Sequence, residues 1–190
     1  MLPIRDAPGK LSPIEITEQA MEIGEILKGQ YEQGHAILQG VMADIDQGLV
    51  NETSGLGTLG SVGSIFAHMV FTEDAIISSA RGAKPIFEAG GWNKRIGIQS
   101  PGLRQSAEWA ATAKLDLPVF QEFAKEVFES TEQFVSTLTA ADMDREIEGL
   151  GGNKVKLALM VATVGTIHIC EHTGEIAAIK GVRGLKGLPF

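Results

Sequence analysis

The sequence predicts an all-α protein that folds as a four-helix bundle with a long connection between its second and third helices. Apolar residues recur at steps of three and four along four segments, and helix start and stop signals flank these segments. No segment keeps the two-residue alternation that is typical of a strand. The 190 residues, of which 44% are hydrophobic and 21% charged, suit a single globular domain over residues 1–190.

The first helix is expected over Ile14–Ile45, where the apolar residues fall on one helix face. Ser12 is a suitable N-cap, Pro13 fits the first turn and Glu15 completes a capping-box pattern. Gly48 and the polar, glycine-containing residues after it end this helix.

The second helix is expected from about Leu59 to Ala80, with Arg81-Gly82 as its end. The third is expected over Leu117–Leu138, because Asp116 can cap it and aromatic and aliphatic residues line one face. The residues 139–142 resemble a capping box and predict one short extra turn.

The connection between these helices, from Gly82 to Asp116, is long for a compact domain. Part of it is expected to form a short helix from Ser100 through Ala113, since Ser-Pro is a common helix start. The remainder, which contains Trp92 and Arg95, is a candidate cover for an active site.

The fourth helix is expected over Lys154–Lys180, after the break at residues 151–152 and before a stop at Gly181. A short β-branched run at residues 161–164 fits the helical pattern better than a strand. No strand is therefore predicted anywhere in the chain.

Charge and cysteine content exclude several classes of protein. The net charge of −8 and the isoelectric point near 5.0 argue against binding to nucleic acid or to an anionic membrane. The single cysteine, Cys170, excludes a disulfide framework and indicates a cytoplasmic protein. No apolar run is long enough to cross a bilayer, and the first ten residues lack the apolar core of a signal peptide.

Three of the four histidines form a candidate metal site. His168 and His172 are four residues apart on a predicted helix, so both imidazoles lie on one face. The run His-Ile-Cys-Glu-His lacks the glutamate of the HExxH zinc motif at its second position, which disfavours that class. His68, on the second helix, is the candidate third ligand, although a histidine within a helix is more often structural or solvated. Three imidazoles suit Zn²⁺, Ni²⁺ or a similar divalent ion and leave a coordination position open.

Glu73 and Glu175 are candidate partners for the second ring nitrogen of a metal-bound histidine. Alternatively, each is a solvated glutamate at a helix edge or pairs with Arg81 or Lys180. His35 is expected at the flank of the bundle and Cys170 in its core. The motifs of serine hydrolases, P-loop proteins and dinucleotide-binding proteins are absent from the sequence.

Two segments resemble the DinB-like superfamily: Gly60–His68 with Glu73-Asp74, and His168–Gly181. The tail Gly184–Phe190 is similar to the ending of many members. This superfamily includes DNA-damage-inducible proteins, mycothiol-dependent maleylpyruvate isomerase and bacillithiol S-transferases. The resemblance implies a four-helix bundle, often dimeric, with a three-ligand divalent metal site at His68, His168 and His172.

The expected function is that of a metal-dependent enzyme in which the open position activates a low-molecular-weight thiol or water. Thiol transfer, thiol-assisted isomerisation and hydrolysis of a small-molecule substrate all remain open, and the thiol is expected from a cofactor and not from Cys170. Trp92, Arg95 and Arg104 are candidate substrate contacts, and no catalytic residue is assigned. The alternative is a non-catalytic helical protein that binds a ligand or partner, with a structural or vestigial histidine cluster.

Overall fold

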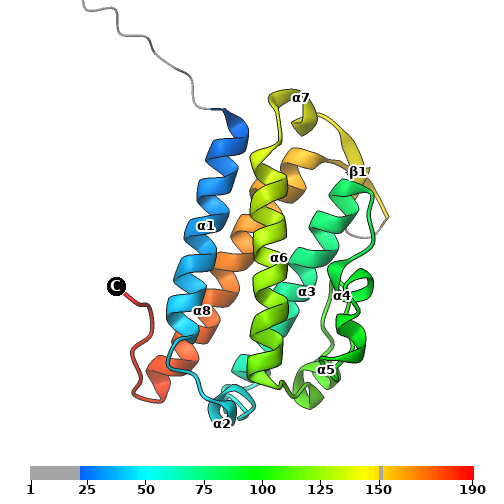
Figure 1. The fold of residues 1–190 in the computed structure, drawn as a ribbon. Coiled ribbons are helices and arrows are strands. Elements are labelled where there is room, and N and C mark those ends of the chain that lie inside the picture. The colour runs from blue at the N-terminus through cyan, green and yellow to red at the C-terminus, as the bar shows by residue number, and fades with distance from the viewer. Residues whose placement is uncertain (1–21, 150–151) are drawn as a thin grey trace, which may run out of the picture.

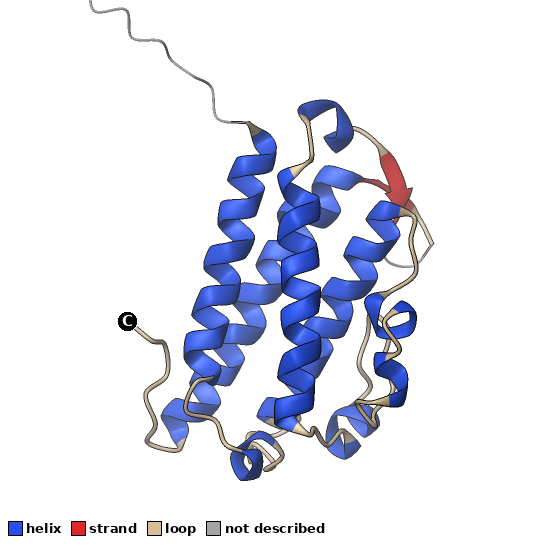
Figure 2. Ribbon diagram, viewed as in Figure 1, coloured by secondary structure: helices blue, strands red, loops and turns tan. Residues whose placement is uncertain are grey.

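The computed structural model describes residues 22–149 and 152–190. Four long helices form a bundle (Figure 1): α1 (Ile23–Met42), α3 (Val62–Arg81), α6 (Leu117–Ser136) and α8 (Thr166–Val182). Apart from one short hairpin, the secondary structure of the described residues is helical (Figure 2). The predicted all-α bundle is therefore confirmed.

The order of the helices around the bundle explains the long connection. α1 packs against α6 and α8, and α3 packs against the same two helices, so α1 and α3 lie diagonally opposite. α3 and α6 run in the same direction, and α1 and α8 run in the other (Figure 1). Because α3 and α6 are parallel neighbours, the chain must return along the full length of a 20-residue helix, about 30 Å, before α6 begins.

α1 is shorter at its end than the sequence predicts. It stops at Met42 instead of Ile45, and a separate turn, α2 (Gln47–Val50), follows. Asp46 causes this break, because its side chain accepts a hydrogen bond from the Leu49 amide and caps the new turn. The expected start of this helix and its caps, residues 12–21, lie outside the described residues.

α3 begins and ends close to the predicted positions. Ser61 caps it through a hydrogen bond from the Ser64 amide, and Gly82 ends it in the left-handed conformation. Nearly the whole helix is buried, since α6, α8 and the long connection cover it on different sides. A buried helix of this kind can hold polar side chains inside the protein, and α3 places His68 and Glu73 there.

The long connection holds α4 (Ile86–Ala89), η1 (Trp92–Lys94) and α5 (Ala107–Thr112). α5 begins at Ala107, not at Ser100 as predicted. Gly102 has φ +71°, which is incompatible with a helix there, and Ser106 provides the cap by accepting from the Trp109 amide. This segment packs against α3 and α6.

Asp74 anchors the connection to the bundle, and replacing it is expected to destabilise the fold. This buried carboxylate accepts hydrogen bonds from the amides of Ile86 and Phe87 at 2.8 and 2.9 Å, which begin α4. In Asp74→Asn the amide group cannot accept from both, so the free energy of unfolding should fall by about 1–3 kcal/mol. Chemical denaturation measures this loss. Glu122→Gln, at an exposed ion pair with Arg95, is the control and should change stability by less than about 1 kcal/mol.

The third long helix and the turn after it follow the prediction closely. Asp116 caps α6 by accepting from the Val119 amide. α7 (Ala140–Met143) has the expected capping box, in which Thr139 and Asp142 each bond the backbone of the other.

A short antiparallel hairpin corrects the prediction that the chain has no strand. β1 (Glu146–Glu148) pairs with β2 (Lys154–Lys156), where the fourth helix was expected to begin. The register places Glu146 opposite Lys156 and Glu148 opposite Lys154, so opposite charges face one another across the pair. Strands of three residues are too short for their alternation to be recognised in a sequence.

α8 is preceded by an unusual helical segment. The residues Leu159–Gly165 (η2) form a π-helix that continues directly into α8. α8 then extends to Val182, slightly past the predicted stop, and Gly184 follows in the left-handed conformation.

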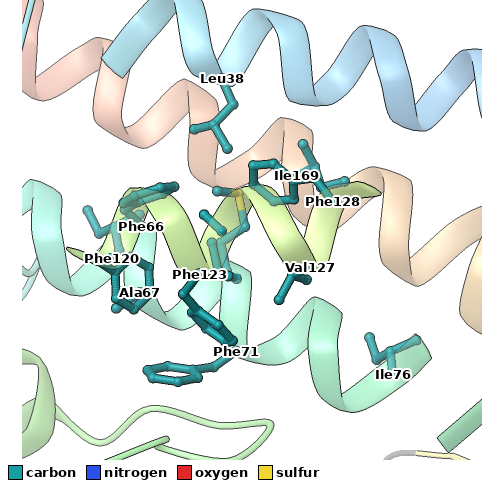
Figure 3. Packing of buried hydrophobic residues seen from close by; sticks show 14 of the residues in the cluster. Leu38, Phe66, Ala67, Phe71, Ile76, Phe120, Phe123, Val127, Phe128 and Ile169 are labelled. Carbon is teal, nitrogen blue, oxygen red and sulfur yellow. The ribbon is translucent and has the colours of Figure 1, made fainter. Parts of the chain in front are cut away.

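Side chains from all four long helices meet in the core (Figure 3). Leu38 of α1 and Ile169 of α8 approach Phe123 and Phe128 of α6, and Phe66 and Phe71 of α3 complete the layer. The rings of Phe71, Phe120 and Phe123 lie edge to face or tilted, with centroids 5.5–5.6 Å apart. In the described part of the chain, no helix combines the length and apolarity that crossing a membrane requires.

Candidate metal centre

α3 and α8 bring His68, His168 and His172 together. The Nε2 atom of His168 lies 3.2 Å from that of His68 and 3.1 Å from that of His172. All three ligand atoms lie within 4.8 Å of one another, so the cluster can hold a metal ion. His168 and His172 converge because they are one turn apart on α8, and His68 faces them because α3 packs against α8.

A hydrogen bond from α1 holds the π-helix that precedes α8. The hydroxyl of Tyr31 on α1 donates to the carbonyl of Val161 at 2.9 Å, and this hydroxyl is packed against Gly165. A π-helix shifts the register of every residue that follows it, so this segment helps to set which face of α8 carries His168. Such segments occur frequently at functional sites.

Hydrogen bonds to the outer nitrogens orient two of the rings. Glu175 Oε2 lies 2.6 Å from His172 Nδ1, so this nitrogen carries a proton and Nε2 directs its lone pair at the cluster. Thr72 Oγ1 lies 3.4 Å from His68 Nδ1. Glu175 therefore occupies the position that was expected of a partner for a metal-bound histidine.

His68 and His168 are uncharged at neutral pH, which is the state that a metal requires. Burial, with a smaller contribution from the nearby His172, lowers the pKa of His68 to about 4. Burial, followed by the effects of His172 and His68, lowers the pKa of His168 to about 3.

The donor set fits a divalent metal ion. Two nitrogens bound at about 2.05 Å in tetrahedral geometry lie roughly 3.3 Å apart, close to the 3.1 and 3.2 Å separations here. His68 is buried, whereas His168 and His172 are partly exposed, so the cluster is reachable from solvent. Three protein ligands leave a position open, as in catalytic zinc sites.

Several residues singled out from the sequence lie elsewhere. Glu73 contacts His35 and not the cluster, with Oε2 at 3.1 Å from Nε2. Cys170 is exposed, so its expected place in the core is wrong, and it lies in the surface groove between α8 and α1. His35 is 2% exposed and lies inside the bundle, not at its flank.

Trp92, Arg95 and Arg104 also lie apart from the histidines. Trp92 donates to Glu126 and packs on Phe123, both on α6. Arg95 stacks on Trp92 and pairs with Glu122, and Arg104 is exposed on the connection. The connection covers the side of the bundle formed by α3 and α6, whereas the histidines lie between α3 and α8.

Sequence reasoning missed a second polar cluster. His35 bridges Glu73 of α3 and Glu132 of α6, at 3.1 and 2.7 Å. The only signal in the sequence is that His35 and Glu73 both fall on apolar helix faces. Glu132 carries none, since a glutamate at a helix edge is ordinary.

Comparisons with known proteins support the fold alone. No protein-family model and no curated protein matches the sequence. The structure is similar to the crystal structure of a conserved protein of a locus from Enterococcus faecalis, with a TM-score of 0.74 and 13% sequence identity. The similarity covers 87% of this chain and 99% of that chain. Membership of the DinB-like superfamily, a homodimer and a cytoplasmic location stay predictions.

Proposed function

We propose that this protein is a metal-dependent enzyme of the DinB-like class, with Zn²⁺ or Ni²⁺ held by His68, His168 and His172. The observation that carries the proposal is the convergence of three Nε2 atoms, two of whose separations match those of ligands on one ion. The uncharged imidazoles of His68 and His168 favour the binding of a cation, and a set of three protein ligands leaves room for an exogenous ligand.

The metal would supply Lewis acidity, which lowers the pKa of a bound thiol or water and yields a nucleophile at neutral pH. The chain's own contribution is to position the ligands. Glu175 orients His172, and the packing of α8 on α3 holds His68 opposite the pair. This chemistry suits thiol transfer, thiol-assisted isomerisation or hydrolysis of a small substrate.

Metal content of untagged protein is the first test. We expect close to one Zn²⁺ or Ni²⁺ per chain and loss of binding in His168→Ala, with the helical circular dichroism retained. Glu175→Gln should weaken metal affinity about 10–100-fold, because its amide no longer fixes the His172 ring as strongly. Glu171→Gln, exposed on the same helix, is the matched control and should bind metal normally.

Two outcomes would contradict the proposal. Less than about 0.2 metal ions per chain, with no uptake of added Zn²⁺ or Ni²⁺, would exclude the site. Unfolding of the bundle on addition of a chelator would instead favour the alternative of a structural metal in a non-catalytic protein.

Cobalt substitution tests the open position. Co²⁺-loaded protein with Cys170→Ser, titrated with 2-mercaptoethanol, should show a new thiolate-to-cobalt charge-transfer band. The absence of a band at saturating thiol would leave water as the remaining candidate for the activated group. A spectral shift with added azide would then show that the position is open to an exogenous ligand.

A further inference from the structure

A cleft lies between α1 and α6, on the side of the bundle opposite the histidine cluster. One part, a cavity of about 250 Å³ near the end of α1, is lined mainly by apolar side chains, among them Leu38, Met42, Phe66 and Ala124. The adjoining part, of about 420 Å³, lies further along the same two helices and has more polar walls. Both parts share Gln39, Lys125 and Phe128 in their walls, so they form one amphipathic cleft.

The polar part contains a carboxylate that is held in place from inside the protein. Glu132 lines the cleft, and its Oε1 lies 2.7 Å from His35 Nδ1. His35 is 2% exposed, stacks on Phe128 with ring centroids 4.0 Å apart, and contacts Glu73 through Nε2. Both ring nitrogens of His35 contact carboxylates, so the ring cannot turn freely. The buried His35 therefore holds the Glu132 carboxylate in a fixed position in the wall of the cleft.

The charges of this cluster do not balance. The polar part presents three carboxylates, those of Glu32, Glu129 and Glu132, against two basic groups, Lys125 and His35. No lysine or arginine among the described residues pairs with Glu132. The charged neighbours in the cleft are already paired: Lys125 with Glu129 at 3.7 Å, and Glu32 with Lys28 at 3.3 Å. Acidic groups therefore outnumber basic groups at the polar end, next to an apolar cavity.

We infer that the cleft between α1 and α6 binds a small organic cation with an apolar tail. The ammonium group would lie at Glu132 and the tail in the cavity beside Phe66 and Ala124. Binding sites for small molecules combine apolar walls with a few fixed polar groups in this way. An anion is disfavoured, because both basic groups in the walls are already paired with glutamates, Lys125 with Glu129 and His35 with Glu132.

Titration of the full chain with n-hexylammonium, followed by amide chemical shifts, tests the inference. We expect saturable binding with a Kd of about 1 mM or tighter, with the shifts on α1 and α6. 1-Hexanol should bind more weakly and hexanoate should not bind. Because the cleft is remote from the histidine cluster, the result should be the same in chelator and with metal bound, whatever the outcome for the metal site.

Two substitutions on α6 should act in opposite directions. Glu132→Gln keeps an acceptor for His35 but removes the charge, and should weaken hexylammonium binding about fivefold or more. Lys125→Gln, at an exposed position, should strengthen it. Glu122→Gln, exposed on the same helix, is the matched control and should leave it unchanged.

Three results would overturn the inference: no saturable binding of hexylammonium, hexanoate binding as tightly, or unchanged affinity in both Glu132→Gln and Lys125→Gln. Circular dichroism of each variant shows whether it is folded.

Discussion

Replacing Gly165 by alanine is expected to lower the free energy of unfolding by about 3 kcal/mol, or the Tm by roughly 6–12 °C. A Cβ atom built on Gly165 overlaps the Tyr31 hydroxyl and lies 3.0 Å from Cζ of the ring. Tyr31 is fully buried, so the ring has no free space to enter. The substitution must break the hydrogen bond from Tyr31 to Val161 or separate α1 from α8.

Gly174→Ala, in α8 directly after the π-helix that ends at Gly165, is the control. A Cβ there meets no atom within 4 Å, so alanine should stabilise the protein by up to about 1 kcal/mol through its helix propensity. The two glycines thus separate the packing effect from the propensity effect. Equal effects of the two substitutions would contradict the role assigned to Gly165.

A double-mutant cycle identifies the clash as the cause. Tyr31→Phe removes the hydroxyl that overlaps the new Cβ, at the cost of the bond to Val161. The double variant should be more stable than the sum of the single effects by about 1 kcal/mol or more. Additive effects would show that alanine acts on α8 in another way.

The stability of the metal-free protein is expected to fall as pH rises above 6.5. Burial opposes a proton on His35, but the hydrogen bonds and charges of Glu73 and Glu132 outweigh it and raise the pKa above its ordinary value of 6.5. The folded chain therefore holds this proton more tightly than the unfolded chain. The resulting stabilisation is complete below pH 6.5 and is lost as pH rises through the raised pKa.

The ionisation of other buried groups does not change this expected fall in stability above pH 6.5. Burial and the charge of Glu73 raise the pKa of Tyr31 far beyond it, so the phenol stays neutral. His68 and His168 have lowered pKa values, and their effect on stability appears below pH 6.5, where it has the opposite sign.

His35→Ala should cost about 3–5 kcal/mol near pH 6, because it leaves Glu73 buried without a partner. His35→Gln keeps a donor but does not titrate, so the fall in stability above pH 6.5 should disappear. Glu32→Gln, exposed on the same helix, should retain it. Urea denaturation across this pH range measures the stability of all three variants. If the free energy of unfolding of His35→Gln still fell above pH 6.5 as in the unsubstituted protein, His35 would not be the group responsible.

The helices and the pair His168 and His172 were accessible from the sequence because they follow from local periodicity. His168 and His172 lie one turn apart on any helix that contains both, and their convergence needs no tertiary information. Ser61, Asp116 and Thr139 act as caps through bonds to amides three residues away, so their signals are also local.

The errors have two kinds of cause, which are contacts with another element and backbone geometry within the segment itself. Lys154–Lys156 pairs with Glu146–Glu148 as a strand because opposite charges face each other across the hairpin. Cys170 is exposed because α8 directs the face of His168 and His172 towards α3. Gly102 and Ser106 delay the start of α5, which a helix-start signal at Ser100 does not reveal.

The sequence by itself determined the helix content, most helix ends and the pair of histidines one turn apart on α8. The tertiary structure alone decided that His68 completes the cluster and that Glu73 binds His35. It also decided that the connection between α3 and α6 crosses the bundle away from the site. The physical reason is that helical spacing determines which residues share a face, whereas the packing of one helix on another determines what that face meets.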